Sequence, residues 1–160
     1  MCSSDLEEKP CCGVSTLEAM AWNLSHVDGL ICCAMDARRQ QVYNALFRAQ
    51  GGALTRLTPD RAISLEELFR DPLMAEKAQI LVGDGAELCY NEGKARELPV
   101  RLAPPHLSFQ RASGVAMAAA LMAERGELCP AGELRASYLR LSQAERERQE
   151  RLKREQTRNG

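Results

Sequence analysis

Short apolar runs separated by polar turns fill the first half of the chain. Two runs of strand length, 30–35 and 41–47, are joined by a short polar segment, and the glycines at 51–52 precede a third run at 53–57. The second run has no clean period of two, so its buried face stays open. Strands in series with short connections predict an antiparallel meander.

Helix signals flank this meander. Ser15 and Glu18 have the spacing of a capping box, in which the serine hydroxyl accepts from an exposed amide and the carboxylate reaches back. Ser64 can cap another helix over 65–69, and Pro72 closes it. We therefore expect one helix before the meander and one after it.

The second half of the chain contains a compact strand-to-helix signal. The run 80–82 is short and fully apolar, as is typical of a central strand covered on both faces, and Gly-Asp-Gly at 83–85 leads into a helix beginning near Ala86. Prolines between 99 and 105 predict an extended connector. The stretch 116–123 is apolar almost all round, so we expect a buried helix there.

Composition narrows the class of protein. The chain has 160 residues, 45% of them hydrophobic and 27% charged, which suits one globular domain with a core. A net charge of −1 gives no overall attraction to phosphate backbones or anionic lipid. The acidic start is unlike a signal peptide and no run reaches the ~18 apolar residues of a membrane span, so we expect a cytoplasmic protein.

The metal-binding residue types are poorly spaced for a metal site. Seven cysteines include adjacent pairs at 11–12 and 32–33 and no C-x-x-C motif, while His26 and His106 are isolated. Neighbouring strand residues point to opposite faces, so neither pair forms an easy chelate. We expect reduced, mostly buried thiols and no metal.

Two short segments carry candidate chemistry. Strand-Gly83-Asp84-Gly85-helix is a geometry in which backbone amides can hold an anion, but a phosphate loop normally has more glycine and no carboxylate, which favours a turn or cap role for Asp84. Asp36 and Arg38 have the residue types of a phosphoryl-transfer site. The same residues suit a hairpin turn in which Asp36 bonds its own backbone, and on spacing alone we favour the turn.

Four blocks of sequence carry a family resemblance. In order, "GVSTLEAMA" at 13–21, "AMDARRQQVYNALF" at 34–47, "LVGDGAELCY" at 81–90 and "YLRLSQAERE" at 138–147 resemble the C-terminal half of the TsaB (YeaZ) family. That family is the bacterial dimerisation subunit of the machinery that makes threonylcarbamoyladenosine next to the tRNA anticodon.

The resemblance implies a fold and a domain organisation. It implies an α/β, actin-like (ASKHA, ribonuclease-H-like) lobe, with a mixed sheet flanked by helices, from a family with two lobes. We assign 1–12 to an unmatched N-terminal segment, 13–141 to the C-terminal TsaB-like lobe and 142–160 to a charged terminal helix or tail. We expect the family's N-terminal lobe to be absent, which leaves self-association open.

The resemblance also implies a role. TsaB is regarded as a non-catalytic scaffold that pairs with the catalytic subunit TsaD and helps recruit the ATPase TsaE, so tRNA is met indirectly. ATP and metal are then expected on the partner, with no cofactor in this chain. The segment 83–85 lies where catalytic relatives carry a nucleotide motif, and the corner with Asp36, Arg38, Arg39 and nearby Tyr43 resembles the family's strand connection, with contacts as a further possibility.

Two alternatives stay open. One is an enzyme, either an ATP-dependent threonylcarbamoyl transferase or a metallopeptidase-like relative, and retention of a nucleotide would favour it. The other is a small RNA-binding module, which steep salt dependence of tRNA binding would favour. The second needs aromatic side chains flanked by basic ones on a sheet face, whereas only 4% of the residues are aromatic.

Overall fold

The computed structural model describes residues 9–75, 79–137 and 139. The predicted charged tail at 142–160 lies outside the described residues, as do residues 1–8 of the unmatched N-terminal segment. The proposed domain boundaries therefore stay predictions.

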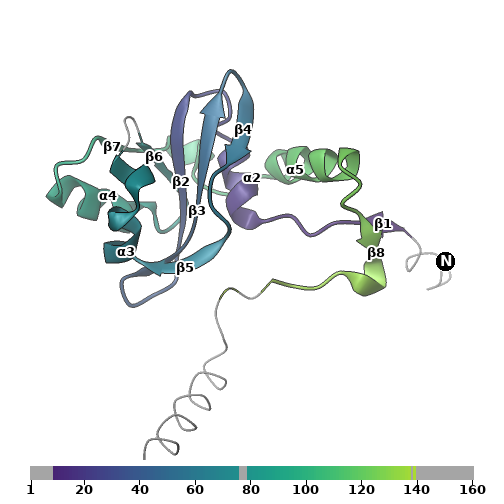
Figure 1. Ribbon diagram of the computed structural model, residues 1–160. Helices are drawn as coiled ribbons and strands as arrows, with labels where there is room; N and C mark the ends of the chain where they lie inside the picture. The colour runs from purple at the N-terminus through teal and green to yellow at the C-terminus, as the bar shows by residue number, and fades with distance from the viewer. Residues whose placement is uncertain (1–8, 76–78, 138, 140–160) are drawn as a thin grey trace, which may run out of the picture.

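The described chain begins with a short strand and a helix, continues through four consecutive strands and then alternates between helix and strand (Figure 1). In chain order they are β1 (Pro10–Cys11), α2 (Thr16–Trp22), β2 (Gly29–Asp36), β3 (Gln41–Gln50), β4 (Ala53–Arg56), β5 (Arg61–Ser64), α3 (Leu65–Arg70), β6 (Gln79–Val82), α4 (Ala86–Ala95), β7 (Val100–Leu102), α5 (Ala112–Glu124) and β8 (Cys129–Pro130). Short 3-10 helices are η1 (Pro72–Ala75), η2 (Pro105–Leu107) and η3 (Ala131–Glu133).

A six-stranded sheet forms the centre of the molecule. Its order is β4-β3-β2-β6-β7, with β5 paired to β3 beside β4. The meander β2-β3-β4 is antiparallel, as predicted, whereas β6 is parallel to both β2 and β7. The predicted extended connector contains β7, a strand of three residues that is too short to be predicted from its sequence pattern. The predicted mixed sheet of an α/β lobe is confirmed.

Both faces of this sheet are covered. Ile31 and Cys33 of β2 pack in one core cluster with Leu17 and Met20 of α2. The alternate residues of β2 pack in a second cluster that contains residues of α3 and α4, such as Leu68. Strand β3 likewise contributes to both clusters. Its sequence pattern did not show which face is buried, and the structure shows that both are. A strand covered on both sides has no reason to alternate.

The helix caps confirm one prediction fully and another in part. Ser64 and Glu67 form both halves of a capping box at the start of α3. Ser15 accepts from the amide of Glu18 at 3.2 Å, so α2 begins as predicted. The expected reach of the Glu18 carboxylate back to the cap is wrong, because that carboxylate binds the Arg56 guanidinium at 2.7 Å.

Helix α5 is not buried, contrary to the prediction. Among its residues only Gly114 and Ala118 are buried, while Val115 is 40% and Met117 50% exposed. It lies outside α2, with α2 between it and the sheet (Figure 1). A Cβ at position 114 would meet the backbone oxygen of Ala19 at 2.2 Å, so glycine is what allows this close approach. Gly114 and Ala118 are covered, whereas the other apolar residues of α5 are exposed or only partly buried.

Candidate functional site

The corner between β2 and β3 is a strained turn. Arg38, Arg39 and Gln40 have φ angles of 64°, 54° and 59°, in the left-handed region that residues with a Cβ rarely adopt. The Asp36 carboxylate accepts from the backbone amide of Arg38 at 2.7 Å, so the predicted bond of Asp36 to its own backbone is confirmed. The Arg38 guanidinium lies 3.4 Å from the same carboxylate and its side chain is 86% exposed. The contacts of Asp36 therefore favour the turn interpretation.

Both glycines of the Gly-Asp-Gly turn pack against the end of β2. At Gly83 an added Cβ would lie 2.1 Å from the backbone oxygen of Ala34, and φ is +108°. At Gly85 it would lie 2.9 Å from the carbonyl carbon of Met35. These two glycines are thus required by close backbone packing.

The turn does not fit a phosphate cradle. The amide of Gly85 donates to the Ala34 carbonyl at 3.0 Å, and the amide of Ala86 donates to the Gly83 carbonyl at 3.1 Å, so both are engaged. The Asp84 carboxylate is on the exposed side, where an anion would meet its charge. Nucleotide binding at 83–85 stays a prediction, and the contacts of these residues do not favour it.

The hairpin corner and the Gly-Asp-Gly turn, which were identified separately in the sequence, lie in contact in the structure. The carboxylate of Asp84 accepts from the backbone amide of Asp36 at 3.1 Å. Asp36 is the last residue of β2 and Asp84 lies just after the end of β6, and the ends of parallel strands meet at one edge of a sheet. The contact fixes the Gly-Asp-Gly turn to the hairpin corner. Tyr43, which is half-buried as predicted, lies opposite Met35 on the neighbouring strand.

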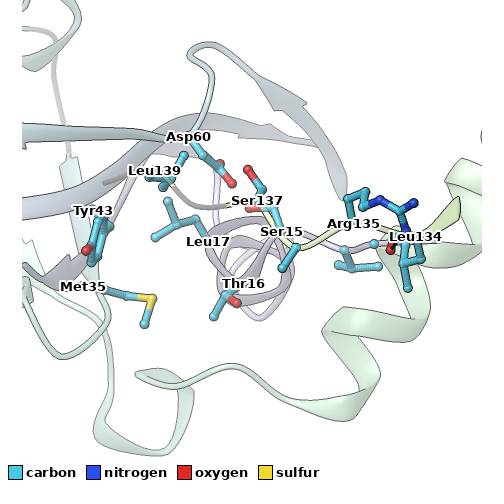
Figure 2. Close-up of a pocket in the computed structure, with 13 residues that line it drawn as sticks. Ser15, Thr16, Leu17, Met35, Tyr43, Asp60, Leu134, Arg135, Ser137 and Leu139 are labelled. Carbon is cyan, nitrogen blue, oxygen red and sulfur yellow. Dashed lines mark hydrogen bonds between the residues drawn. The ribbon is translucent and has the colours of Figure 1, made fainter. Parts of the chain in front are cut away.

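A pocket of about 740 Å³ lies beside this corner, at the start of α2 (Figure 2). Figure 2 shows Met35 and Tyr43 at one end and Leu134 and Arg135 at the other. The lining consists of 13–17, Met35, Tyr43, Asp60, 134–137 and 139. Among the predicted site residues only Tyr43 contributes to it. Three of the four blocks that carry the family resemblance supply lining residues. Their shared resemblance was the only feature of the sequence that could have indicated this pocket.

The acidic group at the pocket is held in an ion-pair network. Asp60 lies 2.6 Å from the Arg56 guanidinium, which also binds Glu18 at 2.7 Å. Desolvation opposes the charge of Arg56, but the hydrogen bonds to Glu18 and Asp60 outweigh it and raise the pKa of the guanidinium. Arg56 also lies over the ring of Phe47, 4.7 Å from its centroid. Arg56 therefore links Asp60 to α2, and the Asp60 carboxylate is engaged in a structural ion pair.

The core thiols are equally unsuited to chemistry. Cys32, Cys33 and Cys89 are fully buried. A hydrogen bond with Cys89, and then desolvation, raises the pKa of the Cys32 thiol well above its ordinary value, while desolvation does the same for the pKa of Cys33. A fully buried thiol of raised pKa is inert, because it forms little thiolate and reagents in solution do not reach it. Across the described ranges, no group of three histidine, cysteine or acidic side chains lies close enough to hold a metal ion.

Comparison with known proteins decides the family. The family model described as TsaD, tRNA N6-adenosine threonylcarbamoyltransferase, matches residues 6–147. The chain belongs to this family. It is also 43% identical over 58 residues to the tRNA threonylcarbamoyladenosine biosynthesis protein TsaB of Bacillus subtilis (strain 168), a stretch that covers 36% of this chain and 25% of that protein. The predicted resemblance to TsaB is confirmed.

Two solved structures from Pseudomonas aeruginosa share the fold. YeaZ has a TM-score of 0.64 at 22% identity, covering 82% of this chain and 60% of the other. An uncharacterised protein with similarity to peptidase YeaZ has a TM-score of 0.63 at 21% identity, covering 83% and 60%. The predicted actin-like class is confirmed, and the chain spans only part of the length of each relative. Among the described residues, no helix is long and apolar enough to cross a membrane.

Proposed function

We propose that this chain is a non-catalytic scaffold subunit, equivalent to the C-terminal part of TsaB, in the complex that installs threonylcarbamoyl on the adenosine next to the tRNA anticodon. Its partner would be a TsaD-like catalytic subunit, and a TsaE-like ATPase and tRNA would be reached through that partner. The observation that carries the proposal is the 43% local identity to TsaB within a family whose description names this modification.

The geometry of the Gly-Asp-Gly turn supports the non-catalytic part of the proposal. A transferase that uses ATP needs backbone amides directed at phosphate oxygens. Here the backbone amides of Gly85 and Ala86 donate hydrogen bonds within the protein, and Asp84 adds a negative charge beside them. We therefore assign ATP and any metal to the catalytic partner.

A transferase remains the second candidate, because the matching family model is described as a threonylcarbamoyltransferase. The two candidates differ in what the isolated chain retains and makes. A transferase would hold ATP and modify tRNA, whereas a scaffold would do neither without TsaD.

The test combines calorimetry with a modification assay. The purified chain is titrated with ATP and with ADP in magnesium buffer, and then assayed for threonylcarbamoyladenosine alone and with TsaD, TsaE and the threonylcarbamoyl donor. We expect no heat of nucleotide binding and no product from the chain alone. Asp84→Asn removes the charge at the turn, and Glu87→Gln removes one nearby as a matched control. Product formed by the chain without TsaD would overturn the proposal.

A further inference from the structure

A pair of cysteines lies outside the main sheet. Strands β1 and β8 form a separate two-stranded antiparallel sheet in which Cys11 is directly opposite Cys129 (Figure 1). The thiol of Cys11 donates to the backbone oxygen of Cys129 at 3.3 Å, across 118 residues of sequence. Both side chains are partly exposed, unlike the core thiols.

The geometry of this pair suits a disulfide. Directly opposed residues of an antiparallel pair have Cα atoms about 4.5–5.5 Å apart, and disulfides span Cα distances of roughly 4.4–6.8 Å. Opposed side chains also lie on the same face of the ladder. Cys12 follows Cys11 immediately in sequence, and successive residues of a strand point to opposite faces. Desolvation, and then the charge and hydrogen bond of Cys129, raise the pKa of the Cys11 thiol, so exchange at this pair is expected to be faster at mildly alkaline pH, where more thiolate forms.

We propose that Cys11 and Cys129 form a reversible thiol-disulfide site that reacts with a small-molecule disulfide such as oxidised glutathione. The Cys11 thiolate attacks one glutathione sulfur, forming a mixed disulfide and releasing the first glutathione as a thiol. The Cys129 thiolate then attacks the Cys11 sulfur, which forms the Cys11–Cys129 bond and releases the second glutathione. The protein loses two electrons and two protons, and the two glutathione thiols gain them.

The consequence of this bond follows from where the two strands lead. Strand β1 runs into 13–17 and β8 runs through η3 into 134–137, and these two segments supply part of the lining of the pocket at the start of α2. The disulfide would join the two pocket walls covalently just outside the pocket. Oxidation is therefore expected to restrict the separation of these walls, and reduction to release it.

Peptide mapping tests the proposal on the full chain. The reduced protein is incubated with oxidised glutathione, quenched by alkylation at low pH, digested and analysed by mass spectrometry. We expect a cross-linked peptide joining Cys11 to Cys129 and a raised melting temperature, because the closed loop restricts the unfolded chain. Both changes should be reversed by a dithiol reductant.

Two single variants make the test specific. Cys129→Ser should reduce the Cys11 cross-link to background and leave Cys11 as a glutathione adduct. Cys12→Ser is the matched control, and it should form the Cys11–Cys129 cross-link in the same yield as the original protein. A wild-type chain in which Cys11 is only glutathionylated, or is joined to Cys12 or to a core cysteine, would overturn the proposal without reference to any variant.

Discussion

Strand β6 and helix α5 are both rich in apolar residues, but they differ in burial. All four residues of β6 are buried, and the strand lies between β2 and β7 with its apolar residues in the core clusters on both faces of the sheet. In α5 only Gly114 and Ala118 are buried, because the helix contacts α2 on one side. Apolar composition therefore predicts burial only for an element that has neighbours on every side. Alanine adds to this difference, since it offers little area to bury.

The largest expected effect contrasts a core side chain with one on α5. Phe47 is 0% exposed, so Phe47→Ala should cost about 3–5 kcal/mol of unfolding free energy. Met117 is 50% exposed, so Met117→Ala should change it by about 0.5 kcal/mol or less. Urea denaturation measures both. Comparable losses would show that α5 is buried in solution and that the contrast is wrong.

Two glycines extend the comparison to the backbone. Gly83→Ala should cost about 2–4 kcal/mol, because the left-handed backbone and the Ala34 carbonyl leave no room for a Cβ. Gly132 in η3 has nothing within 4 Å of an added Cβ, so Gly132→Ala is the control and should be nearly neutral. Thermal unfolding followed by circular dichroism gives both values. A tolerated alanine at position 83 would contradict the close packing on β2.

Neighbouring glutamines should respond with opposite signs. Gln40 holds a left-handed φ of 59° in the hairpin corner, so Gln40→Gly should stabilise the protein by about 0.5–1 kcal/mol. Gln41 is the first residue of β3, and Gln41→Gly should destabilise it by a similar amount. Urea midpoints distinguish the two. Destabilisation by both substitutions would mean that Gln40 is not strained.

The smallest effect concerns helix ends. Hydrogen bonds from the Ser64 side chain and backbone lower the pKa of Glu67, whereas Arg111, the N-cap residue of α5, makes no side-chain cap bond. A lowered folded-state pKa means that this stabilisation is present above about pH 4.3, the ordinary value for glutamate, and is lost as the pH falls through the folded-state pKa. Glu67→Gln should therefore reduce the loss of stability between neutral and acidic pH.

Melting temperatures across that pH range check the prediction. Glu87→Gln is the control, because it removes a first-turn carboxylate of α4 that takes no part in the Ser64 cap. An unaltered acid dependence in Glu67→Gln would contradict the cap contribution.

Local signals predicted most of the central fold. The β2–β4 meander, the Ser64 cap and the strand-turn-helix unit at 80–86 follow from adjacent residues and were found. Strands β1, β5, β7 and β8 were missed, because two to four residues carry too little periodicity to predict a strand. The hairpin corner and the Gly-Asp-Gly turn were predicted as two separate sites. The hydrogen bond from the Asp36 amide to the Asp84 carboxylate depends on the parallel pairing of β2 with β6, which local sequence does not show. The pocket was missed because its walls come from opposite ends of the described chain.

Association with TsaD is the most direct test of the scaffold role. The reduced chain, shown by circular dichroism to be folded, is mixed with TsaD from a matching source and passed through size exclusion with light scattering. We predict a single earlier peak whose mass equals the sum of the two proteins. Separate elution of a folded chain and TsaD over a range of concentrations would contradict the proposed role as a scaffold subunit.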